Sequence, residues 1–254
     1  MPFIPHEHFT SIESTHLHAA SLASELPLSA ERPYYMFTAD RQFGGIGSTK
    51  QSSTRHWVSA STCLALTLLV KKDTDREITQ KIAQRLVTDI SNAFGIQAEH
   101  KWINDIVVDG RKLAGVLCSS VSTPRGPVQV LSVGLNIHLS SKNRESIRSI
   151  NRIDVPTALD ECCDCALQED RVLPVVVGAL LAAISSTFIP RRVFGESHHA
   201  KFYDNDDKVE AFSGVIQGVD VDGTLKVLTN LGPLKLQHIT KYIVCDCNND
   251  VKGD

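Results

Sequence analysis

The pattern of apolar positions along the chain predicts a sheet with helices packed on it. Continuous apolar runs at 62–70 and 128–137 are typical of buried strands, and 34–39 is a third such run of aromatic and small residues. Over 76–94, apolar residues recur every four positions, as in a helix with one face on a sheet. The apolar segment 169–188 predicts a second long helix in the core.

The stretch 101–115, KWINDIVVDGRKLAG, predicts a β-hairpin. Two short apolar runs are joined at Asp109 and Gly110, and Asp-Gly between such runs is typical of a hairpin turn. Lys112 follows the turn and stands near Gly115, which is small enough for a ligand to lie against the backbone. An ordinary turn with a solvated lysine is the alternative, and the turn sequence by itself favours it.

The C-terminal part of the chain has a different pattern. Short apolar segments separated by glycine, asparagine and Asp-Gly over 209–244 predict a small β-barrel or sandwich, and the polar segment 191–207 before it reads as a linker. We therefore expect a catalytic domain at 1–200, a small domain at 208–247 and a frayed tail at 248–254.

Composition and charge narrow the class of protein. The chain has 254 residues, of which 42% are hydrophobic and 22% charged, so a full core can form and disorder is not expected. Its formal net charge of −3 gives no basic footprint for nucleic acid. The N-terminal residues lack export or transit features, and the most apolar segment, 175–184, is too short to cross a bilayer. We expect a cytoplasmic protein that binds neither nucleic acid nor membranes.

The seven cysteines are expected to be reduced, because their number is odd and no export signal is recognisable. Cys162, Cys163 and Cys165 could form a zinc site with Cys245 and Cys247, but C-C-x-C and C-x-C lack the C-x2-C spacing of structural zinc sites. Incidental thiols are the favoured interpretation, and no metal site made by the protein is predicted.

The hairpin stretch resembles the K-W-P-N-D...K-L-A-G signature of biotin protein ligases, in the form that lacks an N-terminal DNA-binding domain. The pair at 14–15 is similar to the start of the S-T-N motif of that family, with His16 in place of asparagine. Gly134 and Asn136 match its G-x-G-x-N segment, with Ser132 in place of the first glycine. The resemblance extends in family order from residue 14 to about residue 239.

The glycine-rich segment before residue 57 resembles the Q-x-x-G-R-G-R-x-G-R-x-W loop of the same family. The matching positions are Gln42, Gly45, Gly47, Arg55 and Trp57. Ile46 and Ser48 stand where the family has arginines, and the loop is a few residues longer. Lys50 could supply charge from the longer loop, but a lysine does not reproduce the planar fork of an arginine.

The resemblance implies a fold, a reaction and a set of partners. The implied fold is α+β: a mixed central sheet flanked by helices, like that of class II aminoacyl-tRNA synthetases and biotin/lipoate ligases, with a small C-terminal SH3-like β-barrel. Biotin and ATP, with Mg2+, would give biotinyl-5'-AMP, and a lysine of a carboxylase's biotin carboxyl carrier domain would then take the biotin. A lipoate or octanoate ligase or transferase of this fold, and a non-catalytic binder of the carrier domain, are the alternatives.

The resemblance also implies which residues carry the chemistry. Lys112 is the expected catalytic cation, and Asp105 is a base or an orienting group, although it could equally hold a lysine or a backbone amide. The biotin-binding positions implied are Ser14, Thr15, Gln42, Gly45, Ile46, Gly47, Trp57, Lys112 and Gly115. The ATP-binding positions implied are Gly47, Ser48, Arg55, Trp57, Asn104, Lys112 and Asn136.

Overall fold

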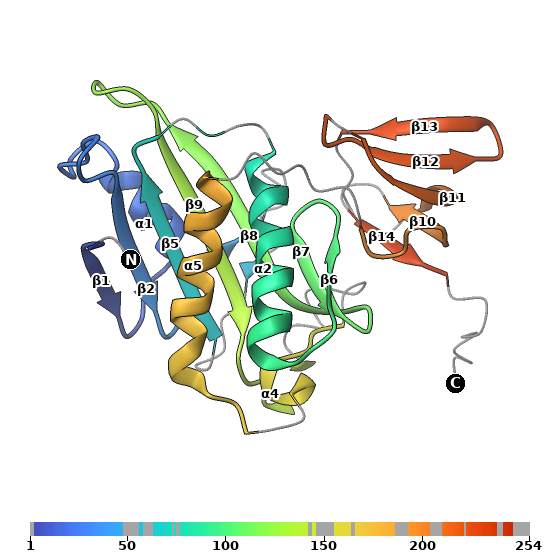
Figure 1. Cartoon of the computed structure of the whole chain (residues 1–254), viewed down its shortest axis with the longest axis horizontal. Coiled ribbons are helices and arrows are strands. Elements are labelled where there is room, and N and C mark those ends of the chain that lie inside the picture. The colour runs from blue at the N-terminus through green and yellow to red at the C-terminus, as the bar shows by residue number, and fades with distance from the viewer. Residues whose placement is uncertain are drawn as a thin grey trace.

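The larger part of the computed structural model is a mixed sheet of seven strands (Figure 1). In their order across the sheet these are β1 (His6–Phe9), β2 (Tyr34–Ala39), β5 (Cys63–Val70), β9 (Val128–Asn136), β8 (Arg111–Val121), β7 (Asp105–Val108) and β6 (Ala98–Lys101). β1 and β2 run parallel, and the other neighbouring pairs are antiparallel. The structure describes residues 3–47, 56–57, 63–72, 74, 77–141, 144–145, 155–163, 166–185, 193–203, 210–220, 222–237 and 241–245.

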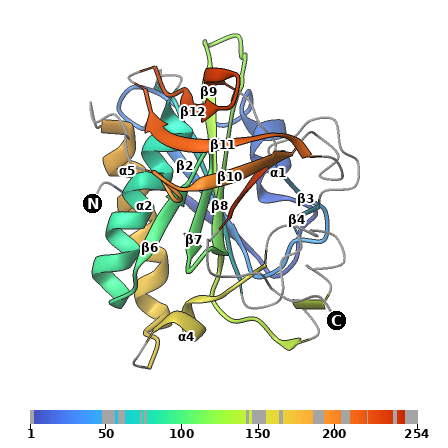
Figure 2. The ribbon, with the colours of Figure 1, turned by 90° about the vertical axis from the view of Figure 1, so that its right-hand side faces the viewer.

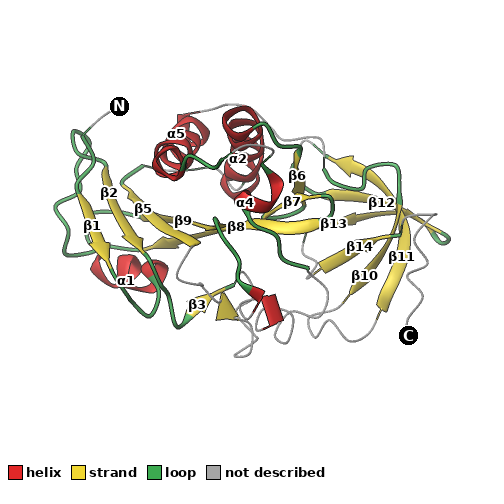
Figure 3. Cartoon of the chain, turned by 90° about the horizontal axis from the view of Figure 1, so that it is seen from below, coloured by secondary structure: helices red, strands yellow, loops and turns green. Residues whose placement is uncertain are grey.

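Helices lie on both faces of this sheet (Figure 3). One face carries α2 (Ile78–Phe94) and α5 (Val172–Ser185). The other face carries α1 (Thr15–Leu22) and the short hairpin of β3 (Gly45–Ile46) and β4 (His56–Trp57). The short helix α4 (Leu159–Cys162) and the 3-10 turn η1 (Glu169–Arg171) precede α5.

The face with α2 and α5 holds the main hydrophobic core. Ile82, Leu86 and Ile90 of α2 are spaced by four residues and fully buried against the sheet, as the sequence pattern predicted. The helix ends at Gly95, whose φ of 68° is a left-handed conformation that glycine adopts without strain. The strands predicted at 34–39, 62–70 and 128–137 are confirmed as β2, β5 and β9.

The predicted hairpin is present as β7 and β8. Its turn residues Asp109 and Gly110 have φ values of 49° and 69°, and two positive values are characteristic of the type I′ turn, which matches the twist of the flanking strands. The Asp-Gly pair therefore determines the turn in the way its sequence suggests.

A second sheet, antiparallel throughout, lies beyond the β6 edge of the first (Figures 1 and 2). Its strands are β13 (Gly232–Leu236), β12 (Leu225–Thr229), β11 (Glu210–Val219), β10 (His199–Tyr203) and β14 (Lys241–Val244), in that order. It begins before the region 208–247 expected for the small domain, because β10 pairs with both β11 and β14. With this sheet beside the helix-flanked one, the α+β fold class is confirmed.

Trp102 joins the two sheets. It lies between β6 and β7, yet it packs in the core of the second sheet with Phe202 and Tyr242. Its indole Nε1 donates to the Gly223 carbonyl at 3.1 Å, and its backbone N–H donates to the Tyr242 hydroxyl at 3.3 Å. The stretch 101–115, which the sequence predicted as a hairpin, therefore contributes to the hydrophobic cores of both sheets.

Candidate active site

A strip of small residues crosses the α1-side face of the larger sheet. Ala39 pairs with Ala65, Ala65 with Gly134, Gly134 with Gly115, and Gly115 with Asp105. Directly paired residues of neighbouring strands share a face, so these five positions form one row over five strands. We call this row the small-residue strip. Residues as small as the alanines and glycines of this strip allow another group to approach the backbone of the sheet closely.

A cation lies at one end of the strip. Lys112 Nζ is 2.7 Å from Asp105 Oδ1, and the side chains are only 19% and 14% exposed. This carboxylate oxygen makes no aligned hydrogen bond within the described residues, so the contact is chiefly an ion pair. The predicted catalytic pair is thus brought together, and the solvated-lysine alternative is not what the structure contains.

A β-bulge directs the lysine to this face. Three positions separate Lys112 from Gly115, so in a regular strand their side chains would point to opposite faces. Between the pairs Val107–Lys112 and Ile106–Ala114 the register shifts, which leaves Leu113 as the extra residue. Leu113 and Ala114 both lie in the core under α2 and α5, and Lys112 is left on the face of Gly115 and Asp105.

The backbone of Lys112 is held independently of its side chain. Its N–H donates to the Val155 carbonyl at 2.7 Å, and its carbonyl accepts from the Thr157 N–H at 2.9 Å. The Asn136 amide nitrogen donates to the Thr157 carbonyl at 2.9 Å, and Asn104 Nδ2 donates to the Val116 carbonyl at 2.9 Å. Both asparagines were predicted to bind ATP, and in this structure their side-chain amides donate to backbone carbonyls near the Lys112 end of the strip.

Polar groups gather at the other end of the strip, around the start of α1. The Thr15 backbone N–H donates to Gln42 Oε1 at 2.7 Å, and the Thr15 hydroxyl donates to the same oxygen at 3.1 Å. Ser14 caps the helix through a long contact of 3.4 Å from the Leu17 N–H. Ser14, Thr15 and Gln42, all predicted to bind biotin, are therefore clustered and buried.

His16 lies next to this cluster and is buried as well. Its Nδ1 is 2.8 Å from the Ser132 hydroxyl, and its Nε2 is 2.9 Å from the Ser119 hydroxyl. Burial lowers the pKa of His16 to about 4, so the imidazole is neutral at neutral pH. Thr67 completes the group, because its hydroxyl is 2.9 Å from that of Thr15 and 2.7 Å from that of Ser132.

Sequence reasoning missed Thr67 and Ser119 as members of this site. Thr67 is a polar residue inside the apolar run of β5, and that exception is a signal that could have identified it. Ser119 gives no comparable signal, since it is 103 residues from His16 in the chain and meets it only through the fold.

The glycine-rich segment is described only in part. Gly45 pairs with Trp57 and Ile46 with His56, so the beginning of the predicted loop and its tryptophan are cross-strand neighbours. Ile46 and Gly47 are exposed. Ser48, Lys50 and Arg55 lie outside the described residues.

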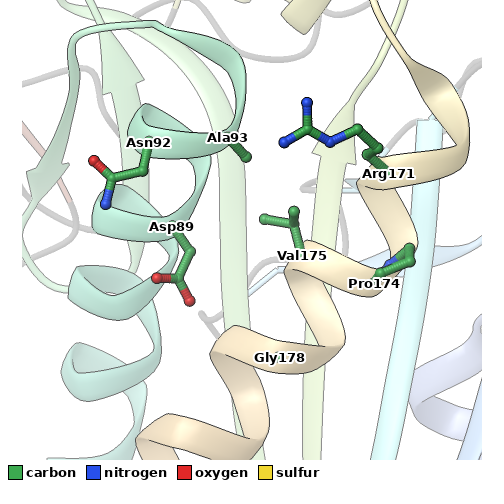
Figure 4. A pocket seen from close by; sticks show the side chains of 7 residues that line it. All are labelled: Asp89, Asn92, Ala93, Arg171, Pro174, Val175 and Gly178. Carbon is green, nitrogen blue, oxygen red and sulfur yellow. The ribbon is translucent and has the colours of Figure 1, made fainter. Parts of the chain in front are cut away.

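A surface hollow of about 370 Å³ lies away from all these groups. It is formed between α2 and the start of α5, with Asp89, Arg171 and Val175 among its lining residues (Figure 4). Since α2 and α5 cover the opposite face of the sheet, this hollow is not part of the small-residue strip.

Within the described ranges, no three His, Cys, Asp or Glu side chains converge as metal ligands. None of the helices found there is both long and apolar enough to cross a membrane.

Comparison with known proteins assigns this arrangement to a family. The family model described as "Biotin/lipoate A/B protein ligase family" matches residues 9–138, a range that holds α1, the small-residue strip and the Lys112–Asp105 pair. The chain belongs to the biotin/lipoate A/B protein ligase family. The resemblance seen in the sequence is thereby confirmed at the level of the family.

Individual relatives agree with this assignment. The chain is 30% identical over 135 residues to biotin--protein ligase 1, chloroplastic, of Arabidopsis thaliana, covering 50% of this chain and 34% of the relative. It is 23% identical over 213 residues to the bifunctional ligase/repressor BirA of Bacillus subtilis (strain 168), covering 79% of this chain and 63% of that protein. The chain therefore spans between about a third and somewhat under two thirds of these relatives.

The fold itself is shared over almost the whole chain. The biotin protein ligase from Aquifex aeolicus, in complex with biotin and ATP, matches with a TM-score of 0.71 at 17% identity, covering 96% of this chain and 100% of that one. At this identity the match establishes the common fold, including the second sheet.

Proposed function

We propose that this protein is an ATP-dependent biotin–protein ligase. It activates biotin as biotinyl-5'-AMP and transfers the biotin to a lysine of a biotin carboxyl carrier domain, with the chemistry on the seven-stranded sheet and the small domain formed by the second sheet from β10 onward. The observation that carries the proposal is the Lys112–Asp105 ion pair at the end of the small-residue strip, inside the range matched by the ligase family. The Aquifex aeolicus ligase of the same fold holds biotin and ATP, which supports these two substrates.

Activation of biotin brings two anions together, the biotin carboxylate and the α-phosphate of ATP. The Lys112 ammonium, held in a largely buried position, lowers the repulsion between them and stabilises the charge that develops on the phosphate oxygens. Asp105 fixes the direction of the lysine side chain. The short backbone contacts of Lys112 with Val155 and Thr157 keep the strand in place while the ligands bind.

The other end of the strip suits the ureido group of biotin. That group carries two N–H donors and a carbonyl acceptor, and Thr15, Gln42 and Ser14 supply hydroxyl and amide partners there. Gly115 and Gly134 let the ring lie on the sheet between the two ends. A slot of small residues with polar groups at its ends is a typical small-ligand site.

The glycine-rich segment, including Gly45, Ile46, Gly47 and Trp57, closes over the ligands in this proposal and keeps water from the mixed anhydride. Ser48 and Arg55 would contact the nucleotide, as would Asn104 and Asn136. Magnesium enters with ATP as part of the substrate, because Mg2+ usually keeps phosphates and water as ligands and needs few from the protein.

In the transfer step, the attacking lysine amine of the carrier domain must lose a proton. Asp105 Oδ1 is 2.7 Å from Lys112 Nζ, and this contact supports a role for Asp105 as an orienting group. A cytoplasmic location is proposed with the function, and the odd number of cysteines in the sequence, seven, supports reduced thiols.

The decisive experiment is the transfer of labelled biotin to a biotin carboxyl carrier domain in the presence of ATP and Mg2+. Transfer to the carrier lysine is expected, and an excess of lipoate should not compete. Binding of the carrier domain without transfer would indicate a non-catalytic binder. Transfer of lipoate or octanoate in preference to biotin would indicate the other branch of the family.

A further inference from the structure

Two positions that depart from the family pattern contact each other. His16 stands in place of an asparagine and Ser132 in place of a glycine, and His16 Nδ1 lies 2.8 Å from Ser132 Oγ. The two residues are 116 positions apart in the chain, and both are buried. They belong to a continuous line of hydrogen-bonding groups that ends at Gln42, which we call the hydroxyl chain.

The direction of the hydroxyl chain is determined at its Gln42 end. The Thr15 backbone N–H can only donate, so the side-chain atom 2.7 Å away must be the Gln42 oxygen and not the amide nitrogen. The Thr15 hydroxyl, 3.1 Å from the same oxygen, must donate to it for that contact to be a hydrogen bond. Thr15 then has no proton for Thr67, so the Thr67 hydroxyl donates to Thr15 over 2.9 Å.

The donor in each of the remaining hydrogen bonds follows from this assignment. Ser132 donates to Thr67 at 2.7 Å, because the Thr67 proton is already used. His16 must then donate from Nδ1 to Ser132, which leaves Nε2 as an acceptor for the Ser119 hydroxyl at 2.9 Å. The reverse direction would make Thr15 Oγ1 and Gln42 Oε1 face each other as two acceptors. Only the first direction makes all the contacts favourable, and it requires a proton on Nδ1 of His16. Because burial lowers the pKa of His16 to about 4, the ring at neutral pH is then the neutral Nδ1–H form.

This direction determines what the chain offers to a ligand. Thr15, Thr67 and Ser132 each give their proton to another protein group, so the hydroxyls present lone pairs only. The Gln42 amide nitrogen has no partner among the described residues and keeps its donors. A ring with N–H donors beside a carbonyl complements this pattern, whereas a dithiolane ring does not.

We propose that His16 is a positioning residue that completes the hydroxyl chain: its Nδ1–H donates to Ser132 and holds the chain in the direction that starts at Gln42, and with it the preference of the slot for a ureido ring. The inference rests on the proposed biotin ligase function, and it adds the group that orients the polar end. Loss of His16 would leave the Ser132 oxygen without its donor, so this hydroxyl would no longer be held from both sides and the acceptors facing the ring would lose their fixed position.

The proton position can be measured without any ligand. Long-range proton–nitrogen correlation spectra of the ¹⁵N-labelled full chain at pH 7 should show His16 neutral and protonated at Nδ1, with the signal assigned by its loss in His16→Asn. A proton on Nε2, or a doubly protonated ring, would overturn the inference. This readout does not depend on catalysis, so it decides on the hydroxyl chain even if the protein proves not to use biotin.

The functional consequence is measured by biotin-dependent pyrophosphate exchange. His16→Asn and Ser132→Gly should each raise the KM for biotin by about tenfold or more, the effect of one unpaired buried hydrogen-bonding group, with kcat changed by about threefold at most. The double variant removes both members of the contact, so its KM should be lower than that of either single variant.

His18→Asn is the matched control, because it makes the same change on the same helix at a ring that packs against Phe9 and Phe37 and is not part of the hydroxyl chain. Its KM should stay near the wild-type value. Unchanged KM in His16→Asn, or a double variant no better than the singles, would overturn the inference while leaving the ligase function intact. Absence of biotin-dependent exchange in the wild type would instead refute the function.

Discussion

Lys112→Ala tests the proposed chemistry most directly. The Lys112 ammonium is 2.7 Å from the Asp105 carboxylate, in a site where the two side chains are 19% and 14% exposed. Removal of the ammonium has two separable effects: the ligands lose a cation, and Asp105 loses its partner. A loss of activity is informative only if the second effect is measured and subtracted.

The structure gives the size of both effects. At 2.7 Å and an effective dielectric constant of about 20, the attraction is about 6 kcal/mol before the cost of desolvation is subtracted. Removing one partner costs roughly 3–5 kcal/mol for a fully buried pair and about 0–1 kcal/mol at the surface. For this partly exposed pair we expect a loss of about 2 kcal/mol in the free energy of unfolding. The lost stabilisation of the phosphate charge should lower the exchange rate by about 10²-fold or more.

Three variants separate the two effects. Lys112→Ala should lose both stability and biotin-dependent pyrophosphate exchange, whereas Lys112→Ala combined with Asp105→Ala should regain most of the stability and none of the activity. Arg111→Ala is the matched control, since it removes the neighbouring cation, whose closest carboxylate oxygens are 3.9 and 4.0 Å away. Exchange above about a tenth of wild type in Lys112→Ala, or an equal loss in Arg111→Ala, would refute the electrostatic role.

Three further predictions concern stability. Burial lowers the pKa values of His16 and His100 to about 4, below the unfolded value of 6.5, so the unfolded state binds protons more readily and stability falls from pH 6.5 toward pH 4. At pH 5, protonation of each histidine in the unfolded state should lower the free energy of unfolding by about 2 kcal/mol. In a His16→Gln/His100→Gln variant, the melting temperature should therefore fall less between pH 7 and pH 5 than in the wild type. Gly214→Ala should destabilise the second sheet by about 2 kcal/mol in denaturant unfolding, because its Cβ would lie 2.6 Å from the Leu228 carbonyl oxygen. Trp102→Ala should lower the free energy of unfolding by about 3–5 kcal/mol, and Trp102→Phe should lower it clearly less, both measured by denaturant unfolding.

The sequence predicted best what local pattern determines. Four-residue spacing of apolar residues gave α2, the apolar runs gave β2, β5 and β9, and Asp109-Gly110 gave the hairpin turn. β1 was not predicted, because His6–Phe9 is rich in histidine and glutamate and lies at the parallel edge of the sheet. An edge strand gains less from apolar burial, so its sequence carries a weaker pattern.

Features that depend on register or on distant contacts could not be derived from local pattern. The bulge at Leu113 places the Lys112 side chain on the same face as Asp105, and nothing in the hairpin sequence indicates an extra residue there. The contacts of His16 with Ser119 and Ser132 cross more than a hundred positions of the chain. Family resemblance identified His16 and Ser132 as two separate departures, and only the fold shows that they form one contact.

Trp102 connects the second sheet to the proposed catalytic pair. Trp102 is anchored in the second core through Gly223 and Tyr242, and Asp105 follows it by only three residues. A shift of that core would therefore move the carboxylate that orients Lys112. The backbone contacts of Lys112 with Val155 and Thr157 oppose such a shift from the other strand of the hairpin. Because the ion pair spans both strands, its geometry depends on the two anchors together, and loosening either one should reduce exchange before it unfolds the protein.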